Sequence, residues 1–290
     1  MNPIQIITDS CCDLPVAIRE QYGILVAPMS YTIAGASYPD DSWVTREASA
    51  FYDDLRAGGL ATTSQVIANQ FTTLFLESLD SGHDVLYIGF SSALSGTLNA
   101  AVLARKTVLR DRPDAEIRIV DSLSASMGFG LVVLEAARLV KQGASLHAVV
   151  QWVEANKLRM NHWFTVDDLE YLRRGGRVSH LASAVGSLLQ VKPVLRVDEE
   201  GCLVPWCKVR GRRKSVEELC QRLVERIVDP AEQTIAISHG DCEADARHLE
   251  ARIREKVQVR ECIVAAIGPA VGAHSGPDTL ALFFWGQGRS

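Results

Sequence analysis

The fold is decided by the stretch Val85-Leu86-Tyr87-Ile88-Gly89-Phe90-Ser91-Ser92-Ala93-Leu94-Ser95-Gly96-Thr97. An apolar run typical of a buried strand ends here in four hydroxyl side chains and a glycine, and an Ala/Leu/Val-rich helical pattern follows over residues 98–109. A strand that enters a helix through such a turn presents backbone N–H groups and a partial positive charge, which favour an anion. No lysine follows the glycine, so this is not the phosphate loop of nucleotide-binding proteins. A small, singly charged group such as a carboxylate is the expected ligand.

Strands and helices alternate around this turn. Strand patterns cover residues 4–7, 24–26, 30–33 and 117–120, and helical patterns begin near Pro15, run over 45–57 with Thr45 as the cap, and cover 71–79 and 127–140. Such alternation predicts an α/β fold in which a mostly parallel sheet carries helices on both faces, in three layers. The helix over residues 127–140 is apolar on nearly every side, so we expect it to be buried, either as plain core or as a wall of a ligand site.

The sequence pattern changes beyond about residue 160. Short apolar runs at residues 191–197, 202–209, 234–238, 257–266 and 280–285 alternate there with amphipathic helices at 216–228 and 243–255. This pattern predicts a second, smaller α+β domain. We therefore expect domains of residues 1–160 and 161–290, with a last strand that could return to the first domain.

Composition argues against several classes of protein. The 290 residues are 47% apolar and 22% charged, as in a globular protein with a sizeable core, and the net charge of −5 argues against nucleic-acid binding. The first residues lack the basic start and apolar centre of a signal peptide, and no window reaches ~18 uninterrupted apolar residues. A cytoplasmic protein is expected. The seven cysteines form no C-x-x-C pair, which predicts reduced thiols instead of a metal site.

Three hydroxyl-bearing turns could meet at one site. They are Thr8-Asp9-Ser10, Thr62-Thr63-Ser64-Gln65 and the turn over residues 91–97. Turns that leave the carboxyl ends of parallel strands converge on one edge of the sheet, where ligands bind. Each hydroxyl could instead cap only its own helix, but the third turn has more of them than capping needs. A shared polar pocket is predicted.

Two segments of the second half could close this pocket. A basic cluster beside a glycine pair consists of Arg173, Arg174 and Arg177. We expect Arg173 and Arg174 to be solvated charges at a helix end, whereas Arg177 is either a third such charge or part of the site. His274 stands in a glycine-punctuated loop over residues 268–277, where no sequence neighbour buries its ring, so a functional role is considered. Five positive charges within residues 208–214 predict a solvated loop before a helix, or a docking surface for an acidic partner or anionic lipid headgroups.

One set of motifs runs in order over nearly the whole chain. It comprises Ile7-Thr8-Asp9-Ser10, Asp13-Leu14-Pro15, Thr63-Ser64-Gln65, residues 91–97, Asp121-Ser122, residues 169–178, Lys192-Pro193-Val194-Leu195 and residues 268–277. In these motifs the chain resembles the DegV family of bacterial fatty-acid-binding proteins. The resemblance implies a two-domain α/β fold with a lipid buried between the domains.

The resemblance also implies a site and a partner. A long-chain fatty acid would be the only ligand, with no cofactor or metal, and its carboxylate would be bound by Thr63 and Ser95 with help from Gly96, Arg177 and His274. Asp9, Ser10, Thr62, Ser64 and Asn99 would form a supporting layer. Some members of the family present their fatty acid to a separate kinase, so a fatty acid kinase subunit is the implied partner.

The chain departs from the family pattern at three places. Cys11-Cys12 replaces a pair of small hydroxyl residues, Val66-Ile67-Ala68 replaces a Pro-Ser-Pro stretch, and Asp278 stands where glycine is common. Asp278 adds a negative charge near the expected carboxylate site, which bears on the geometry of that loop.

The residues alone leave two other functions open. A serine-dependent acyl hydrolase or transferase would use Ser95 as nucleophile and His274 as base, although Gly-x-Ser-x-Gly is absent and no acid can be assigned to orient the histidine. A sugar- or nucleotide-phosphate enzyme would use Asp9, Asp121 and Asp241, without supporting metal-ligand spacing. We prefer the carrier, because each buried methylene of an alkyl tail contributes ~0.8 kcal/mol and hydroxyl donors keep a secluded carboxylate ionised.

Overall fold

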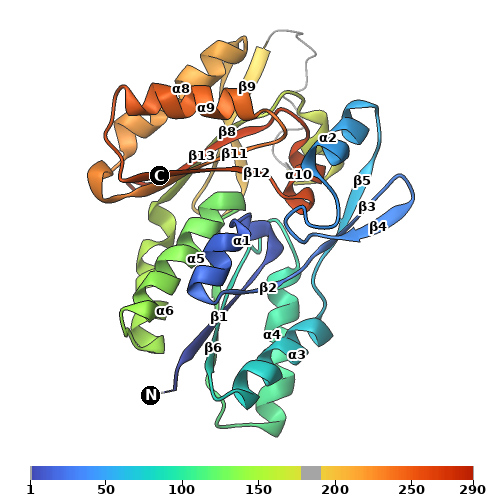
Figure 1. The fold of residues 1–290 in the computed structure, drawn as a ribbon, viewed down its shortest axis with the longest axis vertical. Helices are drawn as coiled ribbons and strands as arrows, with labels where there is room; N and C mark the ends of the chain where they lie inside the picture. The colour runs from blue at the N-terminus through green and yellow to red at the C-terminus, as the bar shows by residue number, and fades with distance from the viewer. Residues whose placement is uncertain (1, 178–190, 290) are drawn as a thin grey trace.

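The computed structural model describes residues 2–177 and 191–289, and its first half is built on a four-stranded parallel sheet. The strand order is β2 (Leu25–Ala27), β1 (Ile4–Asp9), β6 (Asp84–Gly89) and β7 (Ile117–Asp121), as Figure 1 shows. Strands covered by helices on both faces are apolar throughout, which is why β6 reads as a continuous apolar run. The predicted α/β class and parallel sheet are confirmed.

Helices lie on both faces of this sheet. On one face α3 (Ala68–Asp80) packs against α4 (Thr97–Asp111), and on the other lie α1 (Val16–Tyr22), α5 (Ser126–Lys141) and α6 (Leu146–Asn156) (Figure 1). The hydroxyl-rich turn that follows β6 leads into α4, as its sequence predicts. It therefore sits at the carboxyl edge of the sheet, where ligands of α/β proteins bind.

The second half folds around a six-stranded mixed sheet. Its order is β10 (Leu203–Arg210), β9 (Val191–Val197), β8 (Met160–Thr165), β13 (Leu280–Trp285), β11 (Thr234–His239) and β12 (Glu261–Ala266). Only β11 and β12 are parallel to each other, and α8 (Arg212–Arg226) and α9 (Glu243–Arg254) cover one face. The last strand, β13, lies inside this sheet between β8 and β11 and does not return to the parallel sheet.

Helix α5 lies between the two large sheets and contacts both, which explains why its sequence is apolar on almost every side. Two glycines allow this close packing. A Cβ at Gly128 would lie 2.7 Å from the Phe283 ring, and one at Gly130 would lie 3.0 Å from Leu14. Because Phe283 belongs to the mixed sheet and Leu14 to the first half, these glycines let one helix join the two halves.

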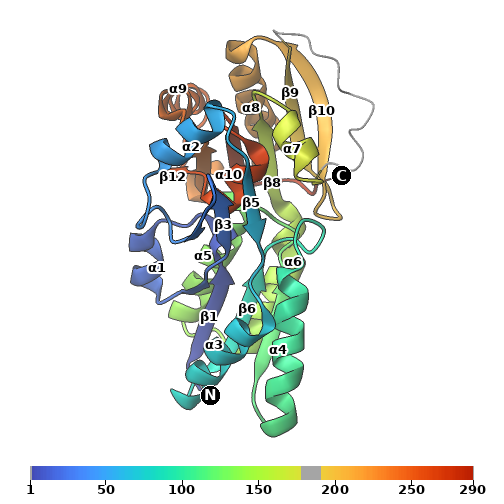
Figure 2. The same ribbon diagram turned by 90° about the vertical axis from the view of Figure 1, so that its right-hand side faces the viewer.

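A third, small sheet completes the molecule. It has the order β4 (Ala36–Pro39), β3 (Ser30–Ile33) and β5 (Ala61–Ser64), and it is accompanied by α2 (Ala48–Arg56), α7 (Glu170–Arg174) and α10 (Pro269–Ser275). Figure 2 shows β3 and β5 beside α10. Tyr31, Phe51 and Tyr52 form an aromatic cluster that Ala273 of α10 joins, so this sheet and α10 share one core. Short 3₁₀ helices cover Ser10–Cys12, Lys157–Arg159 and Pro230–Glu232.

Four local expectations are wrong. Residues 62–64 are not a turn but belong to β5, because they pair with β3 some thirty residues away. Thr45 does not cap α2, which begins at Ala48 after Glu47, and its hydroxyl instead bonds to Asp41. His274 lies in the last turn of α10 and not in a loop. Residues 208–214 are not a loop either, since they span the end of β10 and the start of α8.

Among the described residues, the helices are all too short or too polar to cross a bilayer.

Candidate functional site

A cavity lies between the two halves of the molecule. The first half contributes Phe90 and Leu94 to its wall, and the second half contributes Phe164, Leu172 and Phe283. The wall is mainly apolar, as is typical of small-molecule sites. The cavity therefore suits an apolar ligand.

Contacts bring together four of the polar side chains that line this cavity: Thr63, Ser95, Arg177 and His274. Thr63 comes from β5, Ser95 from the turn after β6, Arg177 from the segment after α7, and His274 from α10. A second pocket shares Thr63, Arg177 and His274 and adds Tyr171 and Arg174. These three shared residues therefore stand at the junction between the apolar cavity and an outer pocket.

Thr63 and His274 form the first contact within this polar group. Thr63 Oγ1 lies 2.9 Å from His274 Nε2, within hydrogen-bond distance. Burial, and to a lesser degree the charge of Arg177, lower the pKa of His274 to about 4, so the imidazole is neutral at neutral pH. A Cβ at Gly175 would overlap the ring of His274, and glycine is therefore needed where the segment after α7 crosses the histidine.

The second contact joins the side chain of Arg177 to the backbone next to Ser95. Arg177 Nε donates to the carbonyl of Leu94 at 3.1 Å, and Arg177 Nη1 donates to the carbonyl of Gly175 at 2.5 Å. Ser95 Oγ lies 3.0 Å from Thr97 Oγ1 and accepts a bond from the Thr97 N–H at 3.2 Å. The hydroxyl of Ser95 thus serves the first turn of α4 while it faces the cavity.

The remaining residues named from the sequence lie farther from the cavity. Gly96 is the N-cap of α4 and does not line the cavity; a Cβ there would overlap the side chain of Gln65. Thr62 lines only the outer pocket, since alternation along β5 turns it away from Thr63. Ser64 and Asn99 are exposed and line neither pocket, so the structure does not bring them to this group.

Asp9 and Ser10 lie one step behind the cavity wall. Asp9 is fully buried and accepts bonds from Tyr87 Oη at 2.8 Å and the Phe90 N–H at 3.0 Å. Burial raises the pKa of Asp9 to about 6. Ser10 Oγ accepts a bond from the Met29 N–H at 3.0 Å. Both residues therefore hold segments whose side chains, Phe90 and Met29, form the wall.

Two further buried carboxyl groups, Asp13 and Asp40, hold the start of α10. Asp13 accepts bonds from the Gly268 N–H at 3.0 Å and from Ser126 Oγ at 2.5 Å. Asp40 accepts a bond from the Ala270 N–H at 3.4 Å. Burial raises the pKa of Asp13 well above its usual range and that of Asp40 to about 7. Asp40 stands in the polar stretch Asp40-Asp41-Ser42, which gave no sign that it is buried.

His162 is a cavity residue that sequence reasoning missed. It belongs to β8, is buried, and packs edge-on against Phe283 with 5.4 Å between ring centroids. Burial lowers its pKa well below the usual range, so it is neutral. Nδ1 lies 3.0 Å from the Met160 carbonyl and Nε2 accepts a bond from the Ala125 N–H at 3.3 Å, which places the proton on Nδ1. No motif marks it, and only its alternation with Phe164 along the strand could have indicated it.

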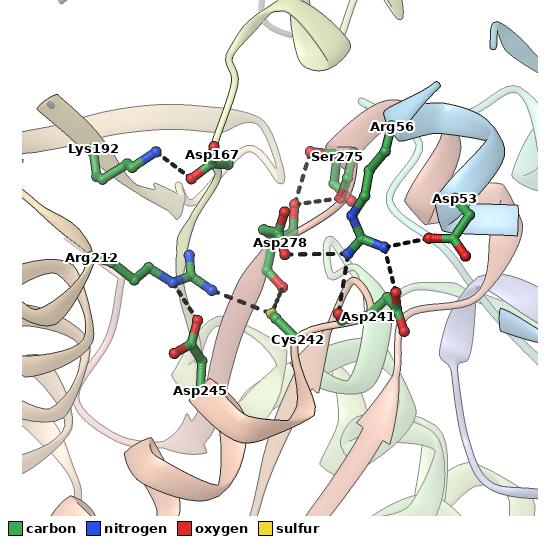
Figure 3. Close-up of polar contacts among 12 residues, drawn as sticks. Asp53, Arg56, Asp167, Lys192, Arg212, Asp241, Cys242, Asp245, Ser275 and Asp278 are labelled. Atoms are coloured by element: carbon green, nitrogen blue, oxygen red, sulfur yellow. Dashed lines mark hydrogen bonds and ion pairs between the residues drawn. The ribbon is translucent and has the colours of Figure 1, made fainter. Parts of the chain in front are cut away.

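The charge of Asp278 is compensated. Arg56 lies 3.3 Å from Asp278 and 2.5 Å from Asp241, and Figure 3 shows its guanidinium among Asp53, Asp241 and Asp278. Asp278 has φ of 58°, a left-handed conformation that glycine adopts most easily, which accounts for the glycine common in the family at this place. It does not line the cavity.

The geometry does not support the two alternative enzymes. Among the hydrogen bonds of the described residues, none joins Ser95 to His274, because His274 Nε2 contacts Thr63 instead. Asp9, Asp121 and Asp241 have separate partners: Tyr87, the Leu123 N–H and Arg56 respectively. Within residues 2–177 and 191–289, no three His, Cys, Asp or Glu side chains are grouped to hold a metal ion.

Comparison with known proteins gives consistent matches. The model of the DegV family, described as an uncharacterised protein family, matches residues 3–287. A DegV domain-containing protein of Clostridium perfringens is 44% identical over 287 residues, or 99% of each chain. A DegV lipid binding protein of Thermotoga maritima is 31% identical with a TM-score of 0.87, and covers 99% of each chain. A DegV family protein of Thermus thermophilus, described for its fatty acid binding, is 30% identical with a TM-score of 0.86, over 99% of this chain and 100% of its own.

Proposed function

Because the chain belongs to the DegV family, we propose that it binds a long-chain fatty acid in the cavity between its two halves. One observation carries this proposal: a mainly apolar cavity is lined by Thr63, Ser95, Arg177 and His274, which contacts join in two pairs. A ligand with an apolar tail and a single polar head matches an apolar wall that carries one such polar group. The lipid and fatty acid binding described for the Thermotoga and Thermus relatives supports the same ligand.

The head group is held by hydrogen bonds and one positive charge. Thr63 and Ser95 donate from their hydroxyl groups to the carboxylate oxygens, and Arg177 supplies the compensating charge. His274 is neutral before binding, and it orients the Thr63 hydroxyl through their 2.9 Å contact. Gly96, Asp9, Ser10 and Thr62 support the surrounding backbone, whereas the exposed Ser64 and Asn99 have no part in our proposal.

The tail provides most of the affinity. Each methylene that leaves water contributes ~0.8 kcal/mol, so a chain of many methylenes outweighs the few bonds to the head. Phe90, Phe164 and Phe283 supply much of the apolar surface for it. The head group mainly fixes which end of the ligand faces the outer pocket.

The protein acts as a carrier in the cytoplasm and not as an enzyme. A carboxylate held by Thr63, Arg177 and His274 lies where the cavity meets the outer pocket, so a partner enzyme can reach it there while the tail stays covered. A fatty acid kinase subunit is the partner that the family suggests. Residues 208–214, at the end of β10 and the start of α8, are the surface that we propose for contact with an acidic partner or an anionic membrane.

Two measurements test the proposal. Mass spectrometry of the purified, denatured protein should recover a fatty acid. After delipidation, the protein should bind palmitic acid much more tightly than palmitic acid methyl ester, because the ester keeps the tail but loses the carboxylate. Equal affinity for acid and ester would remove the role of the head group, and failure to bind either compound would overturn the proposal.

A further inference from the structure

Arg289, which follows β13, is a buried cation that the proposed function does not use. It is 2% exposed, and all five of its N–H groups donate to neutral acceptors. The acceptors, at 2.5–3.2 Å, are the carbonyls of Leu123, Lys157, Met160 and Asp198 and the hydroxyl of Ser124. Burial of a guanidinium among neutral acceptors is costly, which singles out Arg289 for a role beyond packing.

The acceptors that follow β7 belong to a strained turn. This turn joins β7 to α5, and within it Leu123 and Ser126 have φ of 49° and 50°, a left-handed backbone conformation. Residues other than glycine keep this conformation only where their surroundings hold it. Arg289 holds the turn through the Leu123 carbonyl and the Ser124 hydroxyl. The two residues that come next, Ala125 and Ser126, line the cavity.

The acceptor in β8 supports the cavity wall from the second half. The carbonyl of Met160 accepts a bond from Arg289 Nε at 2.8 Å and lies 3.0 Å from His162 Nδ1. Nε2 of His162 accepts a bond from the Ala125 N–H at 3.3 Å, so the ring connects the two segments that Arg289 holds. We refer to Ala125, Ser126 and His162, which all line the cavity, as the inner wall. Arg289 thus supports the inner wall from both halves of the chain.

The inner wall lies away from the head group. Residues that line the cavity recur at helical spacing from position 267 to position 274, so the cavity runs along α10. Ser126 Oγ and the Gly268 N–H donate to the same carboxyl group, that of Asp13, which places the inner wall at the start of α10. His274, at the head group, lies ~9 Å farther along the helix. A short acyl tail therefore stays beside α10, whereas a long tail reaches the inner wall.

We propose that Arg289 is a positioning residue that makes the protein select long acyl chains over short ones. This inference rests on the proposed function, because it concerns the tail of the same ligand. Arg289 does not line the cavity, and it acts by holding the inner wall in the arrangement against which the end of a long tail packs. Burial lowers the pKa of Arg289 to about 10, so the guanidinium stays charged at neutral pH and keeps its strong hydrogen bonds.

The test measures chain-length selectivity. Delipidated wild type and variants bind a fluorescent fatty acid, which octanoic acid or palmitic acid then displaces, and for each protein we take the ratio of the octanoic acid Kd to the palmitic acid Kd. R289M removes the guanidinium but keeps an unbranched side chain. We expect its ratio to fall about tenfold, as for the loss of one or two buried methylenes. R289K keeps the charge with only three N–H donors, so its ratio should lie between those of wild type and R289M.

R138M is the matched control. Arg138 of α5 also joins the two halves, through Thr234 Oγ1 of β11 at 3.2 Å, but it does not line the cavity. Its ratio should equal that of wild type. S124A removes only one of the five bonds of Arg289 and should lower the ratio less than R289M does. This variant keeps the inference testable if thermal melting shows that R289M does not fold.

The remaining outcomes count against the inference. A ratio that is unchanged or higher in every folded variant of Arg289 and Ser124 would overturn it. An equal loss of affinity for both acids, or a fall of the ratio in R138M as large as in R289M, would also overturn it, because either result shows a general loss of stability. If wild type binds neither acid, the proposed function itself fails.

Discussion

The two ends of α10 are held in opposite ways. At its start, backbone N–H groups of Gly268 and Ala270 donate to the buried carboxyl groups of Asp13 and Asp40. At its end, the side chain of His274 reaches Thr63 at the boundary of the cavity. The start is held by backbone contacts in the protein interior, and the end offers side chains to a ligand. The difference teaches that one short helix can be rigidly anchored at one end and still present a binding group at the other.

The largest effect is expected from removing an anchor at the start. Asp40→Ala leaves the Ala270 N–H and the Ser10 hydroxyl, which also bonds to Asp40, without a partner in the interior. We expect the free energy of unfolding to fall by about 3–5 kcal/mol in a urea titration. Asp53→Ala is the matched control, because Asp53 is an exposed acid on α2. Equal stability of the two variants would show that Asp40 does not anchor α10.

A change of pH should alter the stability of the protein by a somewhat smaller amount. The pKa of Asp40 is about 7 in the folded protein, above the usual 3.8, so the folded state binds the extra proton between these values. Its contribution to stability is present below pH 3.8 and is lost as the pH rises through 7, by up to ~1.4 kcal/mol per pH unit. Relative to Asp40→Asn, wild type should therefore lose roughly 2–4 kcal/mol between pH 4 and 7.

Melting curves of both proteins across this range measure the difference. The buried histidines respond in the opposite direction, because the pKa values of His162 and His274 are lowered and their protonation at low pH destabilises the fold. They are present in both proteins, and their contribution cancels in the comparison. Parallel pH profiles of wild type and Asp40→Asn would contradict the predicted titration of Asp40.

The end of α10 should affect binding more than stability. Thr63→Ala removes a hydroxyl from the head group and leaves His274 Nε2 without its partner. We expect palmitic acid to bind about tenfold or more weakly, a loss of roughly 1–3 kcal/mol, with little change in unfolding. Thr63→Ser should restore most of the affinity, and Ser64→Ala, at an exposed neighbour, serves as the control. A Thr63→Ala variant that binds as wild type would remove Thr63 from the site.

We expect the smallest effect on stability and binding from a substitution at Asp278, just beyond the carboxyl end of α10. Asp278→Gly removes a carboxylate that Arg56 already pairs with, and it places glycine where φ is 58°. The relief of backbone strain offsets the lost ion pair, so we expect stability to change by less than about 1 kcal/mol and palmitic acid affinity by less than about twofold. A large gain in affinity would show that the charge of Asp278 reaches the head group after all.

Much of the fold is predictable from the sequence because the signals are local. The apolar runs of β1, β6 and β7 predict buried parallel strands, and the all-round apolar character of α5 reflects its place between two sheets. Strand β8 was missed because Asn161, His162 and Thr165 make it look polar, although all of its residues are buried.

The parts of the fold and of the site that local signals do not predict depend on contacts between distant segments. Residues 62–64 form a strand only because β3 pairs with them, and α10 is a helix of only seven residues that Asp13, Asp40 and Tyr52 hold in place. Thr63, Ser95, Arg177 and His274 could be named through the family resemblance, and in the structure all four line one cavity. The burial of Asp40 has no local signature, because only the folded chain removes it from water.

The four candidate head-group residues of the cavity form two pairs, and each pair joins the first half of the chain to the second. Thr63 bonds to His274, while Arg177 bonds to the backbone beside Ser95. In an alignment of many relatives, position 63 should covary with position 274, and substitutions at position 177 should track the turn around position 94. Selection would then act on partners rather than on single sites, and a chimera that joins halves with mismatched residues at these positions would lose both pairs at once.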